Sequence, residues 1–292
     1  MITTLRSIAT HDGTFHADEV TACVLLSLFN LIDAEQIVRT RDPQVMAQCE
    51  YVCDVGGIYN PEIKRFDHHQ KEYQGHLSSA GMVLLYLKDK DIISDKGYNF
   101  FQNNLIAGVD AHDNGVAPLL PGISTYSNII SSFVPIRHDS SAEEQNLAFM
   151  EAFYFAHDYL SRIWQKHSYV QSCAKIVADK MQSQSEYLFF EQPMPWMEAF
   201  FELQGIDHVA KFVIMPSGKH WKLRGIPPSL DDPMQVRVPL PKEWAGLLGS
   251  DLQKITGIPG AVFCHKGRFI SVWETSDDAL QALDYVLKNK GD

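Results

Sequence analysis

Acidic side chains and imidazoles gather in the first 115 residues of this chain, in three short runs. The side chains concerned are His11, His16, Asp18, Asp54, Asp67, His68, His69, Asp110 and Asp113. Carboxylates and imidazoles are costly to cluster in an apolar setting unless they bind something, and both are common ligands of divalent cations. The pattern therefore indicates a metal site in the N-terminal part of the chain.

The chemistry that such a cluster can support is hydrolysis of a phosphoester. Two divalent cations held roughly 3.5 to 4 Å apart lower the pKa of a bridging water and hold both the attacking and the leaving oxygen. Such a site needs several hard ligands and one carboxylate that bridges. Asp54 suits the bridging role, because Gly56 and Gly57 let the backbone turn sharply just after it. His16 and Asp18 are two residues apart, so both side chains can point inward before a helix begins.

The neighbouring imidazoles of His68 and His69 are expected to have different roles. Adjacent residues of an extended segment project to opposite sides. One imidazole would then bind metal while the other faces the substrate.

Each of these side chains also has a simpler interpretation. His11 or His112 alone is commonly a hydrogen-bonded structural residue. Asp67 can cap the next turn, and Asp113 can belong to an ordinary Asp-Asn-Gly turn. Glu19 is expected to be a charge in the first turn of a helix. The joint pattern favours the metal site, because most of the clusters fall at predicted strand or helix ends.

The elements that must position these side chains alternate between short apolar strands and helices, which is typical of a mainly parallel sheet. We expect strands at residues 7–9, 37–40 and 51–53 and helices at residues 17–29, 79–87 and 99–109. The strand at 51–53 ends directly on Asp54, and Asp18 lies where a strand-to-helix loop enters the first helix. Ligands bind at such strand ends in open α/β sheets.

The second half of the chain predicts a long helical segment followed by an α+β unit. Residues 141–183 contain no Gly or Pro, and their aromatic residues, expected to be core, recur at helical spacing. Further strands are expected at 209–215, 220–224, 234–238, 260–265 and 269–273, with helices at 242–256 and 276–289. The predicted fold class is α/β, with a metal-binding domain of residues 1–140 that contains a mainly parallel sheet flanked by helices. A helical connector of residues 141–195 and a smaller C-terminal α+β domain of residues 196–292 complete the expected organisation.

Composition is that of a globular protein, with 45% hydrophobic and 21% charged residues in a chain of 292. No apolar run approaches the ~20 residues of a membrane span, and the first ten residues lack the features of a signal peptide. The five cysteines are scattered, without a Cys-x-x-Cys pair, which indicates reduced thiols rather than disulfides or a thiolate zinc site. We therefore expect a cytoplasmic protein that does not contact membranes.

The charge of the chain is unevenly distributed. The net charge of −11 argues against a general affinity for nucleic acid. Residues 1–120 hold 9 basic and 16 acidic residues, whereas residues 205–275 hold 9 basic and 6 acidic residues. An acidic N-terminal part can hold cations and a mildly basic C-terminal part can receive an anion, although uneven surface charge alone explains the difference equally well.

Taken together, Asp54, the run Asp67-His68-His69 and Asp110 resemble the motif series of the DHH phosphoesterase superfamily. That superfamily includes RecJ-type exonucleases and family II inorganic pyrophosphatases. Residues 11–19, 54–57, 65–70 and 109–115 resemble more closely the melanocyte-proliferating-gene-one family of predicted DHH hydrolases. Residues 240–244 and 257–265 resemble the same family, so the resemblance covers nearly the whole chain.

The resemblance implies two divalent metal ions, manganese with magnesium as the alternative, and a smaller C-terminal domain that closes over the substrate. The implied ligands are His11 and His16 for one ion, Asp18, His68 and Asp110 for the other, and Asp54 as the bridge. The choice between Asp110 and Asp113 stays open. His16 stands where an Asp is usual in the wider superfamily, which removes one negative charge and leaves the preferred metal open.

Two residues are implied to act beside the metal ligands. His69 contacts the scissile phosphate or assists the leaving group, and Asp67 orients an imidazole from behind. For the C-terminal domain the resemblance implies substrate recognition, without equally clear motifs. Charge-assisted hydrogen bonds recognise phosphate, so the candidates there are Lys219, Lys222, Arg224, Arg237 and His265.

The leading hypothesis is a metal-dependent phosphodiester hydrolase, a 3′-to-5′ exonuclease that acts on RNA or single-stranded nucleic acid by two-metal activation of water. The direction and the ribonuclease activity come from the resemblance. One alternative is hydrolysis of a small phosphoester, cyclic dinucleotide, short oligonucleotide or pyrophosphate, which fits the acidic charge better. The other is a metal-binding regulatory protein without catalysis. The expected partner is RNA or a short oligonucleotide; no protein partner can be inferred, and a homo-oligomer is compatible with the sequence.

Overall fold

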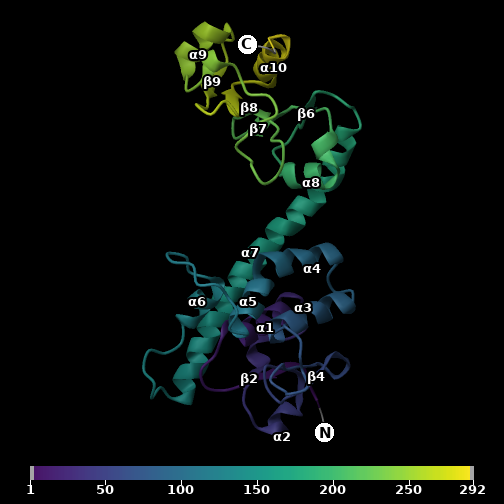
Figure 1. Ribbon diagram of the computed structural model, residues 1–292, viewed down its shortest axis with the longest axis vertical. Helices are drawn as coiled ribbons and strands as arrows, with labels where there is room; N and C mark the ends of the chain where they lie inside the picture. The colour runs from purple at the N-terminus through teal and green to yellow at the C-terminus, as the bar shows by residue number, and fades with distance from the viewer. Residues whose placement is uncertain (1–2, 290–292) are drawn as a thin grey trace. The chain divides into compact units, whose positions relative to one another are not determined.

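The computed structural model describes residues 3–289, which form two compact units (Figure 1). The first unit extends to Gln165 and the second begins at Lys166. The helix α7, Ala142–Met181, contributes residues to both. Each unit has its own five-stranded sheet.

The first unit is built on a mainly parallel sheet, which confirms the expected fold class. Its strand order is β2-β1-β3-β5-β4, and only β4 runs antiparallel to its neighbour. The strands are β1 (Thr4–Thr10), β2 (Ile37–Arg39), β3 (Cys49–Cys53), β4 (Tyr59–Asn60) and β5 (Arg65–Phe66). The three strands expected from the sequence are all present.

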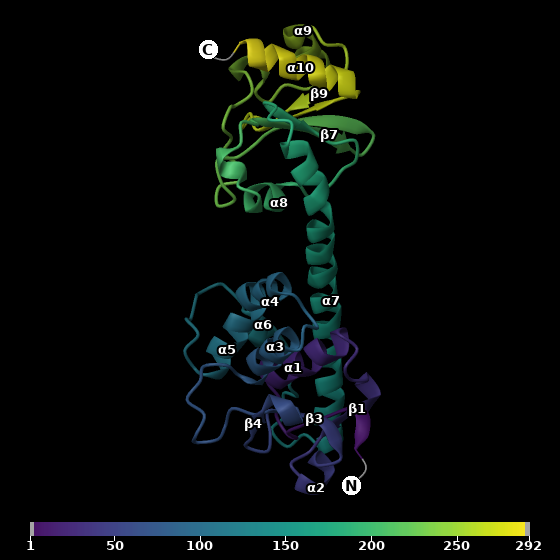
Figure 2. The same ribbon diagram turned by 90° about the vertical axis from the view of Figure 1, so that its right-hand side faces the viewer.

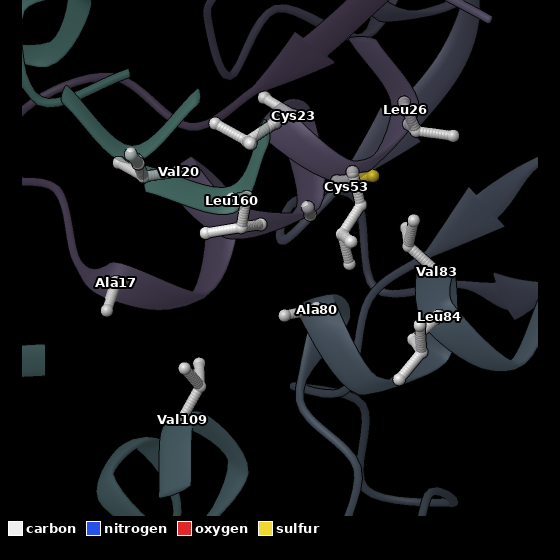
Figure 3. Close-up of a cluster of buried hydrophobic side chains, with 14 of the residues drawn as sticks. Ala17, Val20, Cys23, Leu26, Cys53, Ala80, Val83, Leu84, Val109 and Leu160 are labelled. Carbon is white, nitrogen blue, oxygen red and sulfur yellow. The ribbon is translucent and has the colours of Figure 1, made fainter. Parts of the chain in front are cut away.

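The two faces of this sheet are covered by different helices. Alternate side chains of a strand point to opposite faces, so Ile8 and Cys53 pack in the main core while Ala9 and Val52 pack in a small cluster on the other side. The main core contains α1 (Ala17–Leu28) and α3 (Ser79–Asp89), which contact each other. Figure 3 shows this layer, with Val20, Cys23 and Leu26 of α1, Ala80, Val83 and Leu84 of α3, Cys53 of β3 and Leu160 of α7.

Further helices complete the first unit. They are α2 (Pro43–Met46), the short 3₁₀ helices Ala34–Gln36 and Pro61–Ile63, and α4 (Asp95–Phe101), α5 (Ala107–Asp113) and α6 (Tyr126–Ser131). A π-helical turn, Gln102–Ile106, joins α4 to α5 without a break, so the helix expected at 99–109 is part of a longer one. In α7 the expected aromatic core is confirmed for Phe149 and Phe153, whereas Phe155 is 42% exposed.

The second unit contains a mixed sheet of order β6-β7-β8-β10-β9, in which β6 and β7 are parallel and the other pairs antiparallel. Its strands are β6 (Tyr187–Phe189), β7 (Phe212–Ser217), β8 (His220–Gly225), β9 (Ala261–Cys264) and β10 (Ile270–Trp273). Its helices are α8 (Met197–Glu202), α9 (Gly249–Thr256), α10 (Ser276–Lys288) and the 3₁₀ helices Gly205–Asp207 and Lys242–Trp244.

Strand β7 shows how this second sheet is covered on both faces. Phe212 and Ile214 pack in the core that includes α9 and α10. Val213 and Met215 pack on the other side, in the core that includes α8 and the C-terminal turns of α7 (Figure 2). The expected C-terminal α+β architecture is therefore present.

Two expectations for the C-terminal part are wrong. Residues 234–238 form no strand, because Arg237 bonds only Ile226 through its backbone amide and Val236 lies directly over Gly225. The single helix expected at 242–256 is interrupted, since Gly246, after the 3₁₀ helix, and Gly249, the first residue of α9, adopt positive φ.

Two global features complete the description. All five cysteines are free and buried. Within residues 3–289, the helices are either too short or too polar to cross a membrane.

Candidate metal centre

The carboxyl ends of three parallel strands place the first candidate ligands in one row. The register pairs Ala9 with Val52 and Cys53 with Phe66. Each strand then ends, so the next residues along the row are His11, Asp54 and Asp67. Ligand sites form at this edge of parallel sheets because the loops that follow the strands converge there.

The loop after β1 carries His11 and leads into helix α1. Gly13 turns with φ of +81°, a conformation that costs little without a side chain. His16 is the N-cap of α1, and Asp18 and Glu19 lie in its first turn, where the helix dipole favours negative charge. The ring of His11 is fixed from behind, because its Nδ1 donates to the Asp12 carbonyl over 3.0 Å.

Asp54 follows β3 in the left-handed region, with φ of +58°. Asp tolerates this conformation better than most residues. The chain then turns through Gly56 and Gly57, and the amide of Gly57 donates to Asp67 Oδ2 over 2.6 Å. The turn after β3 is thereby fastened to the residue that follows β5.

Asp67 holds the following imidazole in place. Its Oδ1 accepts hydrogen bonds from the backbone amide of His69 (3.1 Å) and from His69 Nδ1 (2.8 Å). Asp67 is buried and the His69 side chain is 62% exposed. The imidazole that Asp67 contacts is therefore that of His69.

A first group of potential metal ligands contains His11, His16, Glu19 and Asp54, each with one donor atom within 4.8 Å of the others. His11 Nε2 lies 2.9 Å from Glu19 Oε1 and 3.3 Å from Asp54 Oδ2. Glu19, interpreted from the sequence only as a first-turn charge, also accepts from the His16 amide over 2.9 Å. The spacing of a cap residue and a Glu three positions later was the signal for this contact.

A second group contains Asp18, His68 and Asp113, and a third contains Asp54, His68 and His69. His68 Nε2 lies 3.1 Å from Asp113 Oδ2, 3.4 Å from Asp54 Oδ1 and 3.9 Å from Asp18 Oδ2. His68 thus lies among three carboxylates, and Asp54 belongs to both sides of the site.

Asp110 is placed outside these groups of described residues. Its Oδ1 accepts from the amide and hydroxyl of Ser78 at the start of α3, over 3.0 and 2.8 Å. Its carboxyl would collide with a side chain at Gly81. Of the two acids between which the sequence left the choice open, Asp113 is the one that faces His68.

The electrostatics of the site show buried acids balanced by imidazolium groups. The carboxylates of Asp113 and Asp54 raise the pKa of His68 to about 10. Burial alone would lower the pKa of His11, but Asp54 and Glu19 raise it, also to about 10. Burial likewise opposes ionisation of Asp54, yet His11 and His68 lower its pKa to about 2.

Asp18 shows the opposite behaviour. Burial, together with the charges of Asp54 and Asp113, raises the pKa of Asp18 well above its usual range. Its two oxygens accept from the amides of Ser79 and Ala80, over 3.0 and 2.6 Å. A proton on Asp18 removes one negative charge from the site, and the imidazolium groups of His11 and His68 balance others.

The donor set fits divalent cations. Asp54 Oδ1 and His68 Nε2 are buried and make no hydrogen bond with a described residue, although they face each other. Unpaired buried polar atoms are costly, and coordination to a cation would satisfy them. Imidazole nitrogens and carboxylate oxygens together suit ions such as Mn²⁺.

A cavity of about 760 Å³ opens over these residues. Its lining includes eight of the acids and imidazoles that the sequence indicated, with Asp110 absent. Arg41, Thr14, His112 and Ser127 also line it. The volume lies within the range of cavities that hold a small organic ligand.

The cationic candidates of the second unit are largely engaged with their own unit. Arg237 donates to the carbonyls of Gly205 and His208, and Arg224 donates to the Pro233 carbonyl. His265 Nδ1 accepts from the Gly267 amide. Lys219 is exposed in the turn between β7 and β8.

Comparison with known proteins gives a match over nearly the whole chain. The profile of the MYG1_exonuc family, described as an uncharacterised protein family (UPF0160), matches residues 7–285. The MYG1 protein of Chlamydia trachomatis is 50% identical over 285 residues, which make up 98% of each chain. Proteins named MYG1 exonuclease are 32% identical in Mus musculus and 30% in Homo sapiens, over 94% of this chain and 82% and 83% of theirs.

Among solved structures, RecJ of Thermus thermophilus in complex with Mn²⁺ aligns with a TM-score of 0.28 and 10% identity. The alignment covers 97% of this chain and 52% of RecJ, and a likeness this low carries no argument about the site. The family match covers nearly the whole chain at much higher sequence identity, and it confirms the resemblance seen in the motifs. From its sequence and its relatives, this chain belongs to the MYG1 family.

Proposed function

We propose that this protein is a metal-dependent phosphodiester hydrolase. The observation that carries the proposal is the position of Asp54, whose Oδ2 faces His11 and whose Oδ1 faces His68. A carboxylate shared between two ligand groups is the arrangement that two-cation hydrolysis requires. The names of the mammalian relatives, MYG1 exonuclease, support the same reaction class.

Two divalent cations, Mn²⁺ or alternatively Mg²⁺, are proposed to bind on the two sides of Asp54, one among the ligands around His11 and the other among those around His68. The proposed ligands are His11, His16, Glu19 and Asp54 for one ion and Asp18, Asp54, His68 and Asp113 for the other. When bound, the cations would lower the pKa of a water and stabilise charge on the phosphoryl oxygens. Asp113 takes the place for which the sequence suggested Asp110.

His69 is proposed to act on the substrate. Its Nδ1 donates to Asp67, which fixes the tautomer and leaves Nε2 as the other ring nitrogen of an imidazole that lines the cavity. When both ring nitrogens carry a proton, this imidazolium can donate from Nε2 to the scissile phosphate or pass that proton to the leaving oxygen. Asp67 is a positioning residue, because it acts through His69.

The proposed substrate is RNA or single-stranded nucleic acid, degraded from the 3′ end by removal of nucleotides. The cavity volume of about 760 Å³ suits one or two nucleotides rather than a duplex. The excess of basic residues at 205–275 supports an anionic substrate. Arg224, His265, Lys219 and Arg237 stay the proposed contacts of the second unit, although the guanidinium of Arg237 already bonds backbone carbonyls.

A second candidate is hydrolysis of a small phosphoester or of pyrophosphate. The limited volume of the cavity and the net charge of −11 favour a small phosphoester over a long polymer. A regulatory metal-binding protein without catalysis is disfavoured, because the donor groups of both sides are present together with an oriented His69.

The test is a hydrolysis panel with purified, metal-free protein to which Mn²⁺ or Mg²⁺ is returned. The substrates are 5′-labelled and 3′-labelled RNA, single-stranded DNA, a dinucleotide and pyrophosphate. Stepwise shortening from the 3′ end of RNA is expected, and labels at both ends establish the direction. Absence of hydrolysis of every substrate, with less than one metal per chain by elemental analysis, would overturn the proposal.

A further inference from the structure

Arg41 is the permanently charged cation among the described residues that line the cavity of the candidate metal centre. The other ionisable side chains of that lining are carboxylates and imidazoles. The carboxylates of the cavity repel a phosphate, and an arginine in the cavity wall provides a positive charge that attracts one. The sequence analysis assigned Arg41 no role.

Arg39 is the last residue of strand β2, and Arg41 lies two residues after it. The two arginines contact the same loop in different ways. Arg39 donates to the Gly13 carbonyl and to Asn146 Oδ1, and its guanidinium lies 4.8 Å from the centre of the Phe149 ring. Arg41 donates from Nε to Asp12 Oδ1 over 3.1 Å. Asp12 and Gly13 are consecutive and directly follow His11, so both arginines attach to the loop that carries proposed metal ligands.

The guanidinium of Arg41 differs from that of Arg39 in which of its nitrogens donate hydrogen bonds to the protein. Only Nε of Arg41 hydrogen-bonds a described residue, so both terminal nitrogens stay available. The ion pair is exposed, with side-chain exposures of 64% for Arg41 and 53% for Asp12. Pairs so exposed add little to stability. The contact therefore directs the guanidinium rather than holding the fold together.

We propose that Arg41 binds a phosphate group of the substrate, with Asp12 as the residue that positions it. A guanidinium presents parallel N–H donors that match two oxygens of a phosphate, and it stays charged at every physiological pH. Asp12 occupies Nε and leaves the Nη1 and Nη2 donors for the phosphate. The inference rests on the proposed phosphodiesterase function and adds a contact in the first unit to those suggested for the second.

The experiment compares Arg41→Ala, Arg41→Lys and Asp12→Asn with Arg137→Ala as the matched control. Arg137 is also an exposed, ion-paired arginine of the first unit, at 68% exposure, and it does not line the cavity. Three quantities are measured for each variant: KM and kcat on a short RNA with Mn²⁺, and the Kd of adenosine 5′-monophosphate by calorimetry. Thermal unfolding verifies that every variant is folded.

Arg41→Ala is expected to raise KM and the Kd of the nucleotide by about 10-fold or more, while kcat changes less than KM. Arg41→Lys should recover part of the loss, because it keeps the charge but not the fork. Asp12→Asn should weaken binding by a smaller factor, and Arg137→Ala should match the unaltered protein.

The outcomes separate this inference from the proposed function. If the unaltered protein hydrolyses RNA but Arg41→Ala leaves KM and the nucleotide Kd unchanged, the role of Arg41 is refuted and the function stands. If no substrate is hydrolysed, the function fails. The nucleotide Kd then decides separately whether Arg41 binds phosphate: a 10-fold loss in Arg41→Ala supports it, and an equal Kd refutes it.

Discussion

The two carboxylate oxygens of Asp54 face different imidazoles, and its backbone has a left-handed conformation that few residues tolerate. Oδ2 faces His11 and Oδ1 faces His68, while φ is +58°. Asn is the substitution that removes the charge and still accepts this φ, whereas Ala would add backbone strain.

We expect Asp54→Asn to lower turnover by more than about 100-fold, beyond what loss of an outer partner of a metal ligand costs. The metal-free variant should melt at a lower temperature than the unaltered protein, because it lacks the carboxylate that pairs with the imidazolium groups of His11 and His68. The rise in melting temperature that Mn²⁺ causes in the unaltered protein should shrink. Activity assays and melting curves with and without Mn²⁺ measure this, and near-normal turnover would contradict a shared ligand.

Substitutions of Asp110 and of Asp113 are expected to affect different properties of the protein. Asp113 Oδ2 lies 3.1 Å from His68, so Asp113→Asn is expected to impair metal binding and turnover with little change in stability. Asp110 is buried and bonded to Ser78, so Asp110→Ala should destabilise the protein by about 1–3 kcal/mol.

Denaturant unfolding and metal titration of both variants give the comparison. A stable Asp110→Ala protein that has lost its metal, beside a fully active Asp113→Asn protein, would reverse the assignment.

At the scale of elements, the row of strand ends was largely predictable. The apolar runs before His11 and Asp54 are strands, and the sequence alone located Asp54 directly at a strand end and His11 in the loop after the first strand. The two-residue strand β5 was missed, since Arg65 and Phe66 are too few to show a period. Asp67 was nevertheless predicted to belong to the site, because it directly precedes His68 and His69 in the sequence.

Other parts of the site depend on contacts that sequence spacing does not encode. The π-helical turn Gln102–Ile106 shifts the phase of the helix that follows, so an ideal helical period could not choose between Asp110 and Asp113. In the sequence, Glu19 is indistinguishable from an ordinary first-turn charge. In the structure, the loop after β1 places Nε2 of His11, eight positions earlier, 2.9 Å from Glu19 Oε1. Tertiary packing, rather than local propensity, decided both.

The start of strand β1 is fastened by Glu50, and this contact should respond to pH. Glu50 accepts from the Arg6 amide over 2.6 Å and from the Lys64 ammonium. Partial burial raises the pKa of Glu50, but the two donors lower it by more, so the net shift of the pKa is downward. A lowered carboxyl pKa adds stability above the unfolded value, about 4.3, which is lost as pH falls through the folded pKa.

Glu50→Gln is therefore expected to lose about 1 kcal/mol at pH 7 and to unfold with a shallower dependence on pH below about pH 4.3. Urea unfolding of both proteins from pH 7 to pH 3 measures the difference between them. Parallel curves for the two proteins would show that Glu50 does not contribute to the acid response.

At the scale of the whole molecule, the distribution of charge makes salt a useful probe of the substrate. The chain carries a net charge of −11, with basic residues in excess only in its C-terminal part. If the substrate is single-stranded RNA, each phosphate contact should make the binding constant fall with a log–log slope of about −0.7 against salt. We expect a 20-nucleotide RNA to lose affinity steeply between 50 and 200 mM salt and a dinucleotide to lose little. Equal, flat responses would favour the small phosphoester as substrate.

The buried cysteines have a consequence for how the molecule can be followed in solution. Cys23, Cys49 and Cys53 belong to the first unit, and Cys173 and Cys264 to the second. Burial raises the pKa of Cys264 to about 12 and also raises that of Cys49, so little reactive thiolate forms in the native state. A thiol reagent therefore modifies the protein only when a unit opens, and the order in which the five sites are modified records how often each unit does so.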